Sequence, residues 1–347
     1  VDLDVVDGYF VEIAISEIGR VLPFPVACIQ TKAGNDWTND LVGKKLVVDK
    51  WTLEDLVRHQ GVEYVVLRGY YFDEGRNPRV KEIIKDMFEQ RLYYKDKTRF
   101  PDGNPLQLIF KLLMNTSYGI CGLKPIETDI HYEPTKRLPK FLDRHYNSIK
   151  NFTAIGRKQH RIECYKALND TFNRIHCASE VLSMSKTIMN EPFVLAEDLG
   201  ILITYQDTDS MHISADKVND LAYAFRQKYG RELIGKGLGQ FHTDFDYEQC
   251  FAVKNGELGL NTVKSVGEIV ATESIIIAKK TYLDVLKDEA GSVAYHVRGK
   301  GISHRVLVDT VNERFDGDLV QLYHDLYDGK AVDFDFSIKK NIVFKRK

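Results

Sequence analysis

The sequence has little of what marks several protein classes. Its five cysteines are scattered and form no C-x-x-C pair, so neither a zinc ribbon nor a disulfide framework is expected, and a reducing compartment is the default. No uninterrupted apolar run approaches 18 residues, which argues against a membrane span. No charged-then-apolar leader opens the chain, so secretion is not expected either.

A large charge of one sign is also missing, because 48 Lys and Arg residues face 50 Asp and Glu residues, for a net charge of −2. That balance is not typical of a nucleic-acid-binding protein. Basic side chains nevertheless cluster locally, which is as compatible with a charged groove as with a solvated face. These clusters are Lys95, Lys97 and Arg99; Arg157, Lys158, Arg161 and Lys166; and Lys339, Lys340, Lys345, Arg346 and Lys347.

What the sequence does contain is a globular balance, with 44% hydrophobic and 28% charged residues in 347. That length can bury a large core and predicts two or three subdomains. Strands and helices without regular alternation predict an α+β fold. The pattern predicts a strand and then a turn over residues 1–15, and paired strands over 267–286. It predicts helices over 78–95, 105–118 (with Gly119 as C-terminal glycine), 170–190 (with its end disturbed by Pro192) and 217–236.

Two carboxylates stand at the tip of a predicted apolar hairpin in "ILITYQDTDSMHI", residues 201–213. Alternation along a strand would turn Asp207 and Asp209 toward one face and Thr208 away from it. Close carboxylates repel each other unless a cation or basic groups lie between them, and Mg²⁺ prefers such oxygen ligands. The stretch therefore predicts either a magnesium site or, since these are common turn residues, a solvated turn.

The helix predicted in "QLIFKLLMNTSYG" carries an unusual polar row. Helical spacing places Ile109, Leu112 and Leu113 on one side; the other side holds Gln107, Lys111, Asn115 and Tyr118. An ammonium group, two amides and a ring in one row suit a nucleotide, whereas a solvated amphipathic helix is the alternative.

Two further stretches carry weaker signals. In "AKKTYLDVL", Lys280 and Tyr282 would share one strand face, and the lysines would either protect an exposed sheet edge or contact a phosphate backbone. In "DLDVVDGYF", Asp4 ends a strand-like segment and Tyr9 follows it, a pattern that is common in Val-rich strands with acidic ends.

Four segments, taken together, resemble motifs of the family B DNA polymerases. "YQDTDS" resembles motif C, Y-x-D-T-D-S, and "KLLMNTSYG" resembles motif B, K-x-x-x-N-S-x-Y-G, with Thr116 in place of Ser. "DVVDGYF" resembles motif A, D-x-x-S-L-Y-P, at Asp4 and Tyr9, but departs from it at Asp7, Gly8 and Phe10. "KKTY" resembles the K-x-Y motif, and "RGKGIS" resembles the glycine-rich stretch after it.

The order of the segments is the order of the motifs in the family, and the matches span residues 4–303. Short spacings between motifs and the Thr in "NTSYG" are most similar to the protein-primed branch of viruses and linear plasmids. Because the segment departs from motif A at Asp7, this carboxylate would be a third metal ligand, a group that contacts a metal ligand, or an exposed turn residue.

The resemblance implies a role for each matched residue. Asp4 and Asp209 would hold two catalytic Mg²⁺ ions, which Mn²⁺ can replace, with Asp207 in support. Nucleotide binding would involve Lys111, Asn115, Tyr118, Gly119 and Tyr9, and Tyr9 would exclude a 2′-hydroxyl group. Arg91 or Arg99 would supplement Lys111. The primer strand would be held by Lys279, Lys280, Tyr282 and Lys300.

The resemblance also implies an architecture, a right-hand polymerase with an antiparallel palm sheet, helical fingers and a C-terminal thumb. Residues 1–77 would be palm with an insertion, 78–119 fingers, 120–170 an insertion, 171–303 palm and 304–347 thumb. Family members carry a 3′–5′ exonuclease domain upstream, and no suitable D-x-E pair occurs here, so we expect a fragment of a longer protein.

The implied function is template-directed addition of deoxynucleotides to a primer 3′ end, in replication of a viral or plasmid genome. The implied partners are primer-template DNA, deoxynucleoside triphosphates and a terminal protein primer, and the implied location is a host cytoplasm or nucleus, or a virion. Two alternatives remain, an inactive polymerase-like architectural subunit and a reverse transcriptase or RNA polymerase with the same palm. A calcium-binding protein is a third, but it leaves the polar row of the helix unexplained.

Overall fold

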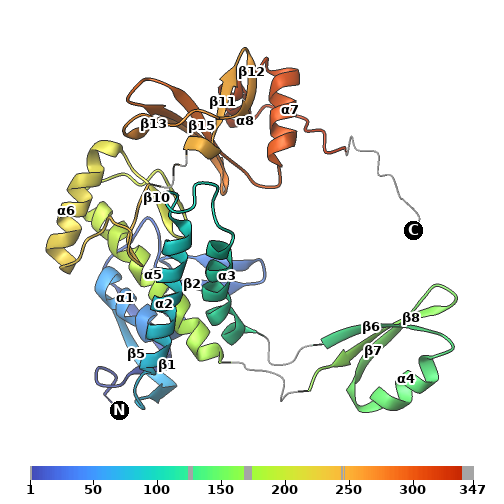
Figure 1. The fold of residues 1–347 in the computed structure, drawn as a ribbon. Coiled ribbons are helices and arrows are strands. Elements are labelled where there is room, and N and C mark those ends of the chain that lie inside the picture. The colour runs from blue at the N-terminus through green and yellow to red at the C-terminus, as the bar shows by residue number, and fades with distance from the viewer. Residues whose placement is uncertain (1, 124–127, 168–173, 244, 246, 338–347) are drawn as a thin grey trace. The chain divides into compact units, whose positions relative to one another are not determined.

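The computed structural model describes residues 2–123, 128–167, 174–243, 245 and 247–337. The chain divides into two compact units, Val1–Glu191 and Pro192–Lys347. Figure 1 shows the helices and strands along the chain. Antiparallel sheets and helices occur in both units, which confirms the expected α+β class. Within the described part of the chain, no helix has the length and apolar character needed to cross a bilayer.

The first unit is built on a three-stranded antiparallel sheet. Strand β1 (Gly8–Ile18) lies between β4 (Lys45–Asp49) and β5 (Val62–Phe72). From Tyr9 to Ile15, every second side chain of β1 is buried, including Val11 and Ile13, as expected for a sheet with one covered face. Helix α1 (Lys50–Gln60) follows β4 and contacts all three strands.

The order of strand and turn at the start of the chain is the reverse of the prediction. Residues 3–7 form turns and bends, and the strand begins only at Gly8. The Asp2 side chain accepts a hydrogen bond from the Asp4 amide at 3.0 Å. Acidic residues that bond to nearby backbone favour turns over strands, which explains why this Val-rich segment is not extended.

The helix predicted over residues 78–95 is confirmed as α2 (Pro78–Lys95), with Asn77 capping its first turn. Helix α3 (Leu106–Gly119) follows and stacks on α2 through Tyr94 and Phe110, whose ring centroids lie 5.8 Å apart. The prediction for Gly119 is wrong. Its φ of −60° is helical, and the chain continues into the 3₁₀ turn η1 (Ile120–Gly122) without a left-handed residue.

Two small sheets complete the first unit. A hairpin pairs β2 (Cys28–Thr31) with β3 (Gly34–Trp37). In the predicted insertion, β6 (Thr128–Pro134), β8 (Gln159–Tyr165) and β7 (Ile149–Ile155) form an antiparallel sheet beside α4 (Leu138–His145).

Helix α5 (Ile175–Asp198) is longer than predicted, because it continues past Pro192. A proline inside a helix costs about 3 kcal/mol or more through its missing N–H and ring clash. The residues beyond it offset that cost by burial. Leu195 and Ala196 pack with Leu221 and Phe225 of α6 (Val218–Tyr229) in one buried cluster.

Helix α6 is shorter than the predicted 217–236, because Gly230 adopts a left-handed conformation at φ +66° and ends it. The N–H of Gly230 donates to the Arg226 carbonyl, as in other glycine-terminated helices.

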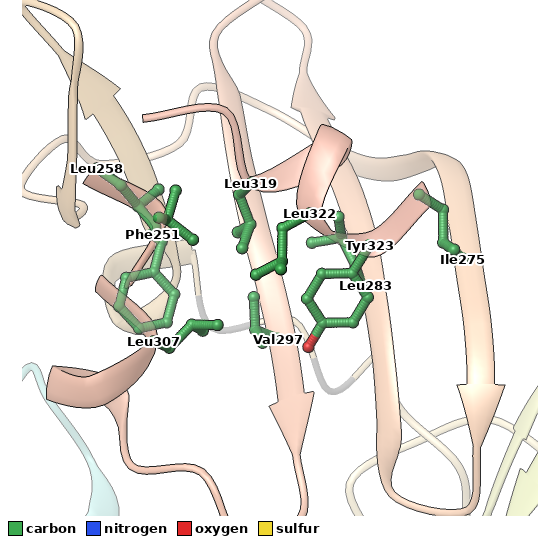
Figure 2. Close-up of a cluster of buried hydrophobic side chains, with 10 residues drawn as sticks. Phe251, Leu258, Ile275, Leu283, Val297, Leu307, Leu319, Leu322 and Tyr323 are labelled. Carbon is green, nitrogen blue, oxygen red and sulfur yellow. The ribbon is translucent and has the colours of Figure 1, made fainter. Parts of the chain in front are cut away.

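A five-stranded antiparallel sheet forms the centre of the second unit. Its order is β12 (Glu257–Leu260), β11 (Phe251–Lys254), β15 (Val293–Gly299), β14 (Thr281–Asp288) and β13 (Ile269–Ala278). The paired strands predicted from the sequence are β13 and β14. Helices α7 (His304–Arg314) and α8 (Leu319–Tyr327) cover one face, where Leu283, Val297 and Leu322 are buried (Figure 2).

Candidate functional site

The predicted hairpin is present, and its tip is a two-residue turn. Strands β9 (Tyr205–Asp207) and β10 (Ser210–His212) pair antiparallel, with Asp207 opposite Ser210. Thr208 adopts φ +56°, and the Asp209 amide donates to the Asp207 carbonyl at 2.7 Å. Asp209 is therefore an exposed turn residue, and the prediction that strand alternation turns it to the same face as Asp207 is wrong.

A lysine, and not a second carboxylate, is the immediate neighbour of Asp207. The Lys280 Nζ atom lies 2.5 Å from Asp207 Oδ2. The hydrogen bond from Lys280 holds the pKa of the Asp207 carboxyl below its usual range and raises the pKa of Lys280. Asp207 is thus ionised and paired, while the Asp209 side chain is open to solvent.

Lys280 lies in the turn between β13 and β14 at φ +61°, so the prediction that it shares a strand face with Tyr282 is wrong. Its backbone N–H donates to the Tyr205 hydroxyl at 2.8 Å, and its carbonyl accepts from the Lys300 amide at 3.0 Å. The three lysines predicted to bind DNA are thereby brought to one end of the sheet, and all three are exposed: Lys279, Lys280 and Lys300.

Aromatic rings join the two hairpins beneath the charged groups. The Tyr205 and Tyr282 centroids are 5.0 Å apart, and His212 lies 5.2 Å from each of them. Tyr282 is only 9% exposed, so it packs against the carboxylate hairpin. The packing of Tyr205 and His212 against Tyr282 is not predicted from the sequence, although alternation along "YQDTDSMH" places both residues on strands.

The predicted nucleotide-binding row lies on α3, in the first unit. Lys111, Asn115, Tyr118 and Gly119 are all exposed. The opposite side of the helix is exposed too, with Ile109, Leu112 and Leu113 at 50%, 64% and 50%. The expected division into a buried apolar side and a solvated polar side is therefore absent from α3.

The two residues of the motif A segment have different surroundings. Asp4 is exposed in the turn before β1. Tyr9 lies on β1 opposite Tyr71 and is 5% exposed, and this burial raises the pKa of its hydroxyl. The Asp7 side chain accepts from the Gly75 amide at 2.7 Å, so it fastens the loop after β5.

The donor set of the hairpin is suited to a hard cation. Asp207 and Asp209 supply carboxylate oxygens, and Mg²⁺ typically binds one or two carboxylates and fills its remaining positions with water or substrate phosphates. In the described parts of the chain, no three His, Cys, Asp or Glu side chains gather into a cluster that could hold a metal by themselves. The hairpin thus fits a cation that is partly ligated by solvent or substrate.

Comparison with known proteins points to one family. Residues 42–195 match the family model described as DNA polymerase type B, organellar and viral. This match contains the α3 row and ends before the carboxylate hairpin. No curated protein matches the chain.

Solved structures extend the likeness over most of the chain. Phi29 DNA polymerase complexed with primer-template DNA is 15% identical, with a TM-score of 0.50 over 89% of this chain and 46% of that one. The ternary complex with incoming nucleotide substrates gives a TM-score of 0.49 at 15% identity, over 90% and 47%. The likeness is one of fold, and the chain spans about half the length of that polymerase.

The pairing of Asp207 with Lys280 makes a prediction for titration. Lys280→Ala removes the hydrogen bond that lowers the Asp207 pKa, so this pKa will rise toward the usual value for Asp of about 3.9. Carboxyl-carbon NMR titration of labelled protein measures the shift.

Lys300→Ala is the matched control, because Lys300 meets this turn through its backbone amide and should leave the Asp207 pKa unchanged. An Asp207 pKa that is the same in Lys280→Ala and wild type would contradict the pairing.

Proposed function

We propose that this chain, whose residues 42–195 match the organellar and viral type B DNA polymerases, is the polymerase region of a template-directed DNA polymerase. It adds deoxynucleotides to a primer 3′ end. The observation that carries the proposal is the junction of the Asp207–Asp209 hairpin with the Lys280 turn, where carboxylates and exposed lysines occur in one unit. The family match and the phi29 polymerase fold support it.

In the proposed mechanism, Asp209 is the principal carboxylate for Mg²⁺, and Asp207 supports it. When bound, two Mg²⁺ ions lower the pKa of the primer 3′-hydroxyl and stabilise the departing pyrophosphate. Asp209 is free to take this role because it is exposed and its turn is held by backbone hydrogen bonds. Asp4, also exposed, is proposed as a further carboxylate ligand of Mg²⁺.

Lys111 is proposed to bind the triphosphate, with Asn115, Tyr118 and Gly119 against the nucleotide. Their exposure in one row of α3 supports this role. The proposed contact of Tyr9 with the sugar remains a prediction, and its 5% exposure disfavours it because a buried ring offers little surface to a ligand.

Primer binding is assigned to Lys279, Lys280 and Lys300, whose ammonium groups suit the phosphate backbone. A primer phosphate near Lys280 would compete with Asp207 for its ammonium group, and so would release this carboxylate toward the metal. Tyr282 is proposed to support primer binding indirectly, by packing against Tyr205, because its ring is buried there.

The proposed layout follows the motif order. The sheets that carry the motifs form the palm, α2 and α3 the fingers, and the end of the chain the thumb; the basic residues at 339–347 lie outside the described residues. The sheet of β6, β7 and β8 is proposed to hold DNA or a terminal protein primer, in a host cell or a virion. Arg157 and Lys158 support this, because both are exposed in the β7–β8 turn.

Primer extension on a DNA template with Mg²⁺ tests the mechanism. Asp209→Asn in the full-length protein should lower the rate of nucleotide addition at least about a hundredfold, because it removes a charged metal ligand worth several kcal/mol in the transition state.

Asp216→Asn is the control, since Asp216 is an exposed aspartate shortly after the same hairpin and bonds to Ser214. It should leave the rate near the wild-type value. Equal rates in Asp209→Asn and wild type would refute the mechanism.

The salt dependence of primer-template affinity tests the insertion. Replacing Arg157, Lys158 and Arg161 by Ala should flatten the slope of log K against log salt by up to about 0.9 for each DNA phosphate that these side chains neutralise in the wild-type protein.

The control replaces three cations in residues 217–228, namely Lys217, Arg226 and Lys228, each of which already lies near an acidic side chain. An unchanged slope in the insertion variant would show that this loop does not hold DNA.

A further inference from the structure

A buried carboxylate lies beneath the candidate site and has no role in the proposed reaction. Asp284 of β14 is 0% exposed. Its Oδ1 accepts from the Ser274 hydroxyl on β13 at 2.6 Å, and its Oδ2 lies 2.9 Å from Nδ1 of His296 on β15. Both residues are its register partners on the neighbouring strands. Because a buried carboxylate is costly without such bonds, this arrangement is a built polar centre across three strands.

His212 connects this centre to the carboxylate hairpin. Its Nδ1 lies 3.8 Å from Asp284 Oδ1, and its ring packs against Tyr282 from the sheet and Tyr205 from its own hairpin. Burial is the main effect on His212 and lowers the pKa of its imidazole. At neutral pH the ring is therefore uncharged, and its contact with Asp284 is a polar contact between a neutral ring and a carboxylate.

From His212 the contacts continue to the proposed metal ligand. Tyr205 is the register partner of His212, and its hydroxyl accepts the Lys280 backbone N–H. The Lys280 ammonium group in turn holds Asp207. A displacement of His212 would therefore be transmitted through Tyr205 and Lys280 to the carboxylate, because each step is a direct contact.

We propose that Asp284 is a positioning residue for the carboxylate hairpin. Through His212 it fixes Tyr205 and Tyr282, and through these the Lys280 turn and Asp207. The catalytic effect of Asp284 rests on the proposed polymerase function, but the coupling of Asp284 to the hairpin does not.

A second buried aspartate on the same strand provides the matched control. Asp288 is 5% exposed, and its carboxylate accepts from the backbone amides of Val266 and Ser292. A general loss of stability on removing a buried carboxylate from β14 should appear in Asp288→Asn as well. A positioning effect should appear only in Asp284→Asn.

Amide hydrogen exchange in the full-length protein, without Mg²⁺ or nucleotide, tests the coupling directly. The amides of residues 205–212 and of Lys280 should exchange about tenfold faster in Asp284→Asn, because the hairpin opens more often when its anchor is weakened. In Asp288→Asn they should exchange at the wild-type rate. Wild-type exchange of these amides in Asp284→Asn would overturn the proposal, and so would equal acceleration in both variants.

Kinetics then test the consequence for catalysis. Asp284→Asn should lower kcat about ten- to a hundredfold, because small displacements of reacting groups are costly. It should leave the KM for nucleotide unchanged, because Lys111, the proposed triphosphate-binding residue, lies on α3 and not on the strands and hairpin that Asp284 contacts. His212→Phe keeps an aromatic ring at this position but removes Nδ1, and combining it with Asp284→Asn should lower kcat no further than either change alone.

Additive losses in this double-mutant cycle, or a wild-type kcat in Asp284→Asn, would overturn the positioning role. Failure of the wild-type protein to extend primers would instead refute the polymerase function, and the exchange measurement would still decide whether Asp284 anchors the hairpin.

Discussion

The candidate site depends on the junction of two hairpin turns. Thr208 and Lys280 both adopt positive φ values, at 56° and 61°, although neither is glycine. Such a conformation costs about 1–3 kcal/mol at each residue and persists only where the surroundings determine it. Here the Tyr205 hydroxyl fixes the Lys280 backbone, and the Lys280 ammonium group fixes Asp207. The two strained turns hold each other in place, and Asp207, Asp209 and Lys280 of the proposed reaction lie on them or directly beside them.

The five-stranded sheet supports this junction, and its two faces have different character, one apolar and one polar. On one face Leu283 and its neighbours pack against α7 and α8, which gives the sheet an apolar core (Figure 2). On the other, Asp284 and His296 form a buried polar centre below Tyr282. Alternation along β14 thus turns Leu283 toward the apolar core and Asp284 toward the polar centre on the other face.

Sequence periodicity predicts the elements whose packing is local. Helix α2 and the pair of β13 and β14 are in this class, since their patterns are regular and their ends carry clear signals. Elsewhere tertiary packing outweighs the local signal, as where α5 continues through Pro192 because the next turn is buried. The Asp207–Lys280 contact joins residues 73 positions apart, so no spacing rule could find it. Motif resemblance identified both residues, but only the structure gave their contact.

The most direct test of a metal-dependent polymerase site is the position of the cation. A crystal structure of the full-length protein with primer-template DNA, incoming nucleotide and Mg²⁺ measures it. The proposed function predicts a Mg²⁺ ion about 2.1 Å from an Asp209 carboxylate oxygen and in contact with the nucleotide phosphates. A cation bound to the nucleotide but remote from Asp209, with Asp207 still paired to Lys280, would contradict the assignment of this hairpin as the catalytic centre.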